Sequence, residues 1–166
     1  MEGDVVSSFR ESVTIAAPVD AVWRLVADVS RHPEFAGPKS ITKQIDFEGE
    51  PEVGREWIAH ERFGPQKFDA PSTVTAVEPG RLFEWVSYPP MKDANRGKGG
   101  IVNWGFLLEP EGADTKLTHY MSVLEPRKGA GMLKGMYAVM SLPKKQRVGG
   151  LTTLGNIKSA AESGDA

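Results

Sequence analysis

The segment formed by residues 12–38 constrains the fold more than any other part of the chain, because strand, helix and turn signals follow one another there. Val13 and Ile15 alternate with polar residues, which predicts a half-buried strand over residues 12–16. Pro18 ends this strand and suits the first turn of a helix, where a proline sacrifices no hydrogen bond. The helix then presents one apolar stripe, Val19, Val22, Trp23 and Val26. Such a stripe must be covered by another element of the fold.

A second, shorter helical turn is predicted around His32 and Phe35, and Gly37 and Pro38 are expected to end it. Beyond it, strand-like runs alternate with short turns rich in glycine, proline and acidic residues. These runs cover residues 40–47, 54–63, 67–77, 81–88, 100–109 and 115–123. Because short turns join neighbouring strands as antiparallel hairpins, we expect a seven-stranded antiparallel sheet, counting the first strand.

Two helical segments are expected near the C-terminus, separated by Pro143, which cannot continue a helix without losing a hydrogen bond. The apolar face of the first, residues 131–142, contains Met132, Leu133, Met136, Tyr137 and Met140. The stripe of the second contains Val148, Leu151, Leu154 and Ala161, with Ile157 at its edge. Gly149, Gly150 and Gly155 each weaken this second helix by about 1 kcal/mol relative to alanine. Packing must therefore hold it, and the inner face of the sheet offers the long apolar surface that can do so.

The order of strand, short helix and shorter helix, with the run DVSRHPEF, resembles the opening of the START-like, helix-grip superfamily of polyketide cyclases/dehydrases and lipid-transfer proteins. The resemblance continues through Val53-Gly54 and residues 76–79, 83–85, 104–110 and 115–119, and residues 151–162 are similar to the closing helix of that superfamily. It implies an α+β helix-grip fold, in which a seven-stranded antiparallel sheet curves around a long C-terminal helix, with two short helices after the first strand. A single START-like domain over residues 1–166 is expected. The superfamily places many functions in one cavity, so the ligand and any reaction stay open.

Composition narrows the function classes. The chain has no cysteine, which excludes disulfides, thiolate metal sites and a cysteine nucleophile. Its formal net charge of -2 argues against a nucleic-acid partner. His32, His60 and His119 lack the spacing of metal ligands, so we expect neither a metal nor a cofactor. The first residues lack a signal-peptide pattern and no apolar run approaches about 18 residues, so a cytoplasmic protein without integral membrane contact is expected.

Residues of equal parity on a strand face the same way, which sets the predicted inner face of the sheet. A face rich in tryptophan, phenylalanine and methionine, with few polar groups, favours a small-molecule cavity, although such residues also form ordinary core. The predicted ligand-binding residues are Trp57, Ala59, Glu61, Phe63, Phe83, Trp85, Val102, Trp104, Phe106, His119, Met121, Met136 and Tyr137.

His119 stands out on this face, because its strand neighbours two positions away are apolar and a buried imidazole needs a hydrogen-bond partner. Two interpretations stay open. In one, Glu61 pairs with His119 across the cavity and the two act as acid and base. In the other, His119 is a hydrogen-bonded core histidine. His32 and His60 are expected to be surface or structural residues.

The main functional hypothesis is binding of a hydrophobic or aromatic small molecule, lipid-like or polyketide-like, between the sheet and the C-terminal helix. The alternative, which the resemblance implies, is a polyketide cyclase/dehydrase that catalyses aldol cyclisation or dehydration. In that enzyme His119 and Glu61 would be acid and base, and Tyr137 or Arg127 would hold a ligand oxygen.

Residues 131–147 leave several interpretations open. Their apolar stripe beside Lys144, Lys145 and Arg147 favours weak contact with an anionic membrane surface. Residues 131–142 alternatively form a lid, a dimer contact or plain core, and the protein is expected to be a monomer or a homodimer. The ends of the chain, residues 1–8 and 163–166, are small, polar and acidic, and we expect them to be poorly ordered.

Overall fold

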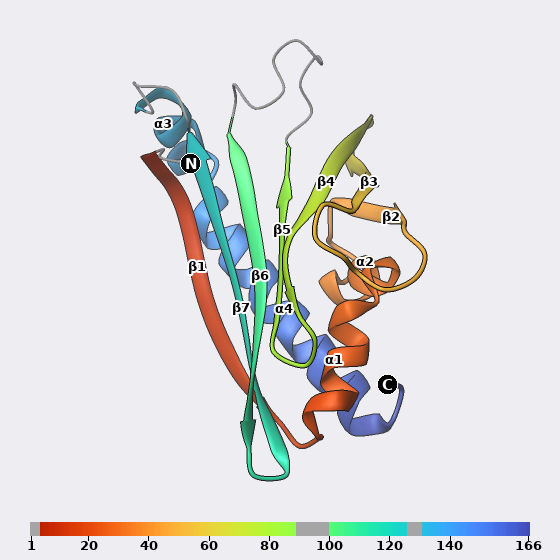
Figure 1. The fold of residues 1–166 in the computed structure, drawn as a ribbon. Coiled ribbons are helices and arrows are strands. Elements are labelled where there is room, and N and C mark those ends of the chain that lie inside the picture. Colours follow the sequence, from red (N-terminus) through yellow and green to blue (C-terminus); the bar gives the residue numbers. More distant parts are fainter. Residues whose placement is uncertain (1–3, 89–99, 126–130) are drawn as a thin grey trace.

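One curved antiparallel sheet and a long C-terminal helix form the framework of the protein (Figure 1). The computed structural model describes residues 4–88, 100–125 and 131–166. In chain order the elements are β1 (Asp4–Ile15), α1 (Val19–Ala27), the 3₁₀ turn η1 (Val29–Arg31), α2 (His32–Ala36), β2 (Thr42–Asp46), β3 (Glu56–Phe63), β4 (Gln66–Glu78), β5 (Leu82–Ser87), β6 (Ile101–Glu111), β7 (Asp114–Glu125), α3 (Gly131–Val139) and α4 (Leu142–Ser163).

The strands lie in the order β1-β7-β6-β5-β4-β3-β2, and every neighbouring pair is antiparallel. Each hairpin therefore joins strands adjacent in the sequence, and β1 closes the sheet beside β7 (Figure 1). The helix α4 crosses one face of the sheet, with α1 and α2 at its side. This arrangement confirms the predicted α+β helix-grip fold and its seven-stranded sheet.

The first strand is longer than the sequence pattern indicates. It begins at Asp4 and pairs along β7, so the prediction of poor order is wrong for residues 4–8. A bulge between Val5 and Ser7 interrupts the alternation of apolar and polar residues that would mark a strand. The buried hydroxyl of Ser7 donates a hydrogen bond of 2.7 Å to Gln146 of α4. Backbone pairing thus orders a segment whose side chains do not resemble a strand.

The break between the C-terminal helices falls before the proline that was expected to cause it. The first helix ends at Val139, and Ser141 adopts a left-handed conformation with φ 53°. Pro143 lies in the first turn of α4, where a proline removes no helical hydrogen bond. The proline therefore starts the second helix, and the turn at Ser141 separates the two.

The buried face of α4 differs from the predicted stripe. Gly150, Leu154, Ile157 and Ala161 are buried, whereas Val148 and Leu151 are 54% and 42% exposed. The reason lies at Gly150, where an added Cβ would come within 2.4 Å of the ring of Phe9. The helix turns its glycine toward β1 because only a residue without a side chain lets the phenylalanine pack so closely. That rotation carries Val148 and Leu151 to the surface.

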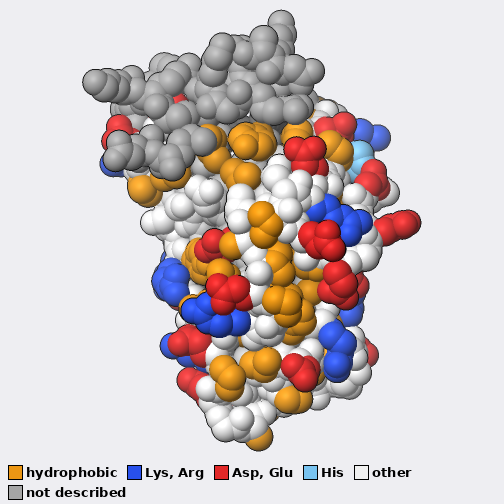
Figure 2. Space-filling model, viewed as in Figure 1, with side chains coloured by type: hydrophobic (Ala, Val, Ile, Leu, Met, Phe, Trp, Pro, Cys, Tyr) orange, Lys and Arg blue, Asp and Glu red, His pale blue; other side chains and the backbone are white. Residues whose placement is uncertain are grey.

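The opposite face of the sheet is exposed and carries charges of both signs among apolar and uncharged side chains (Figure 2). On this side Tyr120 crosses the backbone at Gly105, where a Cβ would come within 2.2 Å of its ring, and its hydroxyl donates a hydrogen bond to Glu84. The guanidinium of Arg10 lies 4.9 Å from the centre of the same ring. In the part of the chain that the structure describes, no helix is both long and apolar enough to span a bilayer.

Candidate functional site

A cavity of about 370 Å³ lies on the side of the sheet that faces α4. Its walls come from the inner faces of β3 to β7, from α2 and β2, and from single residues of α3 and α4. Among the predicted ligand-binding residues, those that line it are Trp57, Ala59, Glu61, Trp85, Val102, Trp104, Phe106, His119 and Tyr137. Strand parity therefore located the central part of the wall, on β3, β5, β6 and β7, before any contact was known.

Aromatic rings form a continuous row across four strands of this wall. Trp57 of β3 lies 6.3 Å from Trp85 of β5, measured between ring centres, and Trp85 stacks on Trp104 of β6 at 6.0 Å. Trp104 in turn stacks on His119 of β7 at 6.0 Å, and Phe106 lies 4.3 Å from the same imidazole. Large rigid rings of this kind offer much contact area to an apolar ligand at little cost in side-chain entropy.

His119 is buried in this row, and its partner is the backbone. Its Nδ1–H donates to the carbonyl oxygen of Gly105 at 2.9 Å. Burial lowers the pKa of His119 to about 4, and the nearby imidazole of His32 adds to this effect. Glu61 instead accepts a hydrogen bond of 3.2 Å from Thr42, and burial raises the pKa of its carboxyl. The direct pair of His119 with Glu61 is therefore not formed, although both side chains line the same cavity.

His32 lines the cavity as well, which sequence reasoning missed when it assigned this residue to the surface or to a structural role. Its Nε2–H donates to the carbonyl oxygen of Val26 at 2.8 Å, and its ring lies 5.3 Å from that of Trp85. Burial lowers the pKa of His32. A signal was available, since His32, Phe35 and Ala36 follow the i, i+3, i+4 spacing of one helix face and all three line the cavity.

The remaining predicted residues lie outside the wall. Phe83 is fully buried and stacks on Trp85 at 5.1 Å, so it packs beside the wall in the main core. Met121 packs with Val6 and Phe9 in a second apolar cluster. Met136 is 48% exposed, because α3 turns Tyr137 toward the cavity in its place. The side chains of Phe63 and Arg127 lie outside the described part of the structure.

Comparison with known proteins fits this architecture. Residues 7–140 match the family described as "Polyketide cyclase / dehydrase and lipid transport". The chain belongs to this family.

A curated relative, the uncharacterized protein Rv0088 of Mycobacterium tuberculosis, is 32% identical over 78 residues. That match covers 47% of this chain and 34% of the relative, so the chain spans about a third of the relative's length. Among solved structures, the ZhuI aromatase/cyclase of Streptomyces sp. R1128 superposes with a TM-score of 0.69 at 18% identity, covering 96% of this chain and 95% of that one. The Polyketide_cyc-like protein Cgl2372 of Corynebacterium glutamicum superposes with a TM-score of 0.58 at 25% identity, over 97% and 94% of the two chains.

In this member of the polyketide cyclase/dehydrase family, further residues of the cavity wall were not predicted. They are His32, Pro33, Phe35, Ala36, Ile41, Thr42, Ile45, Phe68, Ala70, Ser72, Ser87, Tyr88 and Thr153. Strand parity would have found Phe68, Ala70 and Ser72, which alternate along β4. Ile41 lies within the predicted run 40–47 and has the same parity as Ile45, although β2 itself begins at Thr42. Thr153 comes from a helix whose rotation was not known, so no strand pattern marks it.

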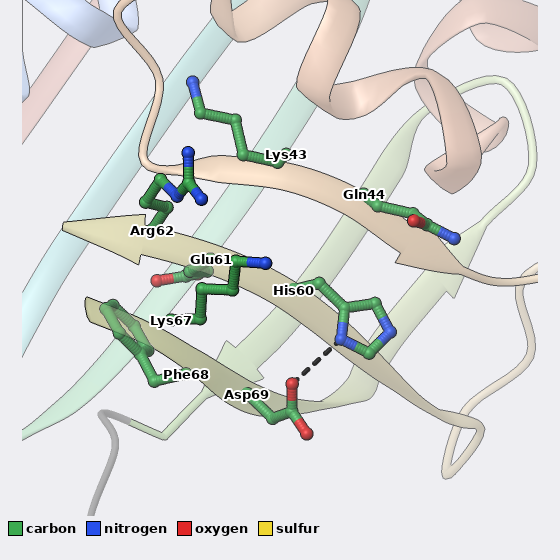
Figure 3. A pocket seen from close by; sticks show the side chains of 8 residues that line it. All are labelled: Lys43, Gln44, His60, Glu61, Arg62, Lys67, Phe68 and Asp69. Carbon is green, nitrogen blue, oxygen red and sulfur yellow. Dashed lines mark hydrogen bonds and ion pairs between the residues drawn. The ribbon is translucent and has the colours of Figure 1, made fainter. Parts of the chain in front are cut away.

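A second depression, of about 620 Å³, lies at the outer surface of β2, β3 and β4 and is lined mainly by charged and polar side chains (Figure 3). There the two ring nitrogens of His60 donate to Asp69 at 2.8 Å and to Asp46 at 2.7 Å. These carboxylates raise the pKa of His60. His60 thus ties β2 and β4 to β3, in agreement with its predicted structural role. Among the described residues, no three His, Asp or Glu side chains group in a way that could hold a metal ion.

Proposed function

We propose that this protein binds a hydrophobic or aromatic small molecule, lipid-like or polyketide-like, in the cavity between the sheet and α4. The observation that carries the proposal is the row of rings from Trp57 through Trp85 and Trp104 on the cavity wall. The cavity volume of about 370 Å³ falls within the range of about 300–1,000 Å³ that small-molecule sites occupy. Membership of a family of polyketide cyclases, dehydrases and lipid transporters supports the same class of ligand.

The alternative is a polyketide cyclase/dehydrase in which His119 and Glu61 serve as acid and base from different strands of the wall. Both side chains reach the cavity, and burial raises the pKa of Glu61, as suits a general acid. The pKa of His119, however, is about 4, whereas an efficient general base has a pKa close to the working pH. Its hydrogen bond to Gly105 also favours the interpretation as a buried structural histidine. These features make binding the better supported function.

Filling the cavity tests the binding proposal. We expect naphthalene to quench tryptophan fluorescence in the natural protein, and Ala59→Phe to weaken its affinity at least about tenfold by occupying the space that the ligand needs. Ala138→Phe is the matched control, because Ala138 lies on the exposed side of α3 and outside the cavity wall. Equal affinities in Ala59→Phe and Ala138→Phe would contradict binding at this site.

Turnover separates the two functions. The variant His119→Gln retains an N–H donor for the carbonyl of Gly105 but cannot act as a base near neutral pH. A binding protein should keep most of its affinity for naphthalene in this variant. An enzyme should lose roughly 100-fold or more of its turnover of a poly-β-keto substrate, the usual contribution of general acid-base catalysis. We expect the first result, and a measurable turnover that disappears in His119→Gln would reverse the order of the two functions.

A specific observation also supports weak contact with a membrane surface through residues 131–147. Met136, Val139 and Met140 are exposed on and just after α3, close in sequence to the exposed Lys144 and Lys145. Apolar side chains beside lysines are typical of helices that lie on anionic lipid. We expect partial co-sedimentation with vesicles of phosphatidylcholine and phosphatidylserine, and none with phosphatidylcholine alone. Binding that is equal in both vesicles would exclude the role of the lysines.

A further inference from the structure

The two histidines of the cavity wall each have one ring nitrogen fixed as a donor. A backbone carbonyl can only accept a hydrogen bond, so the proton must sit on the imidazole nitrogen that faces it. In His32 this is Nε2, which donates to the carbonyl of Val26, and in His119 it is Nδ1, which donates to the carbonyl of Gly105. The structure therefore sets a different tautomer for each ring.

The second nitrogen of each ring faces the cavity. In the part of the chain that the structure describes, neither Nδ1 of His32 nor Nε2 of His119 has a hydrogen-bond partner. Every fully buried side-chain nitrogen and oxygen in that part does have one. These two nitrogens are therefore reached by solvent, and the accessible space that both rings line is the cavity.

Both rings stay uncharged near neutral pH. Burial lowers the pKa of each, to about 4 in His119, and proximity to the other imidazole lowers the latter further. The surroundings are aromatic: the ring of Phe106 lies 4.3 Å from that of His119 and 5.8 Å from that of His32. An uncharged imidazole with one proton already engaged offers a single lone pair, so each cavity-facing nitrogen is a hydrogen-bond acceptor.

Several other polar groups of the wall already have partners. The hydroxyls of Ser72 and Ser87 bond to each other at 2.7 Å, and Thr153 donates to the carbonyl of Gly149 at 3.1 Å. Glu61 accepts from Thr42. The carboxylate of Glu61 keeps further lone pairs that can also accept, whereas the two imidazole nitrogens have no partner at all in the described part of the chain and are free to accept.

We propose that His32 and His119 act as two uncharged acceptors that select an aromatic ligand carrying hydroxyl donors, in a cavity whose binding role is the function proposed above. A phenolic hydroxyl can donate to either nitrogen while its ring packs against Phe106 or Trp104. A methyl ether has no proton to donate, and a carboxylate would bring its own lone pairs and charge against these nitrogens in a desolvated site. Among ligands of similar shape, the cavity therefore prefers those that carry a hydroxyl group able to donate a hydrogen bond.

Three naphthalenes of similar shape test this selection by tryptophan fluorescence. Two neutral hydrogen bonds, each worth roughly 2- to 10-fold in affinity, lead us to expect that 2,7-dihydroxynaphthalene binds about 4- to 100-fold more tightly than 2,7-dimethoxynaphthalene. We expect 2-naphthoate to bind more weakly than the diol. If naphthalene binds but the diol and the dimethyl ether bind equally, the acceptor proposal fails and the binding function stands. If none of these compounds binds, the binding function fails as well.

The tautomers can be measured without any substitution. Long-range ¹H–¹⁵N correlation spectra distinguish bare from protonated ring nitrogens, and at pH 7 we expect bare Nδ1 in His32 and bare Nε2 in His119. Adding 2,7-dihydroxynaphthalene should shift the signals of these two nitrogens and leave those of His60, which lies outside the cavity, unchanged. A second proton on either cavity ring at pH 7, or unshifted signals in a saturated complex, would overturn the proposal.

Substitutions then connect the nitrogens to affinity. In His32→Phe and His119→Phe the aromatic volume remains but the acceptor is lost, so the preference for the diol over the dimethyl ether should fall by roughly 2- to 10-fold in each variant. His60→Phe is the control, since His60 lies at the outer surface, and its preference should equal that of the natural protein. An unchanged preference in both cavity variants would contradict the selection.

Discussion

The space between the sheet and α4 is filled at one end and hollow at the other, and β6 runs through both. Its inward residue Leu108 is 1% exposed and packs in the main core, whereas Trp104 and Phe106 line the cavity. The two ends share one alternating strand pattern. They differ in what covers them, because α1 and the C-terminal half of α4 fill one end, while the described part of α4 contributes only Thr153 to the wall of the other. Some wall residues, such as Trp57 and Phe106, also belong to the main core, whereas Leu108 and Leu154 belong to the core alone. Residues of the second kind should affect stability without affecting binding.

The filled end should carry the largest effect on stability. Leu154 of α4 is 2% exposed and lies in the main core without lining the cavity. Leu154→Ala should lower the free energy of unfolding by about 2–5 kcal/mol, because it removes buried methyl groups and leaves a void. Urea unfolding measures this change. In the folded fraction the affinity for naphthalene should stay close to that of the natural protein, and a parallel loss of affinity would remove the distinction between the two ends.

The hollow end should contribute a pH dependence of stability through His119. Its pKa in the folded protein is about 4, below the ordinary value of 6.5, so the unfolded chain takes up a proton first as the pH falls. The free energy of unfolding should therefore decrease between pH 6.5 and about 4, by about 3 kcal/mol from this residue alone. The raised pKa of Glu61 acts in the opposite direction.

Comparing the natural protein with His119→Gln isolates the contribution of that histidine, since the other titrating groups remain. Urea unfolding at pH 7, 5.5 and 4.5 should show a steeper loss of stability in the natural protein than in the variant. Identical pH profiles for the two proteins would mean that His119 is more accessible to protons than its burial implies.

Removing a tryptophan from the cavity wall should lower the affinity for a ligand. Trp104 stacks between Trp85 and His119, so Trp104→Ala should weaken naphthalene binding by ~1–3 kcal/mol, the scale of one lost buried aromatic contact. Trp23→Ala is the matched control, because Trp23 packs against the core from α1 and does not line the cavity. Titration by calorimetry avoids the loss of a fluorophore. We expect affinity to fall in the first variant and to hold in the second.

The sequence predicted the sheet better than the helix that crosses it. Strand parity depends only on the two-residue period of each strand, so it placed Trp57, Trp85 and Trp104 on one wall. The rotation of α4 depends on a tertiary contact, the ring of Phe9 over Gly150, which no periodicity of the helix reveals. The same limit explains why the partner of His119 was not predicted. Every residue has a backbone carbonyl, so the sequence does not indicate which carbonyl will accept from His119. A carboxylate such as that of Glu61 is visible in the sequence and was therefore the partner considered.

The glycines where α4 passes over β1 give the smallest and most specific prediction. They are adjacent in the chain but face different surroundings: a Cβ on Gly150 would lie 2.4 Å from the ring of Phe9, whereas a Cβ on Gly149 would meet nothing within 4 Å. Gly150→Ala should therefore destabilise the protein by about 1–3 kcal/mol, since a well-packed ring must shift. Gly149→Ala should stabilise it by up to about 1 kcal/mol through helix propensity. Thermal unfolding of both variants provides the measurement, and a gain of stability in Gly150→Ala would show that the closeness of Phe9 does not set the rotation of α4.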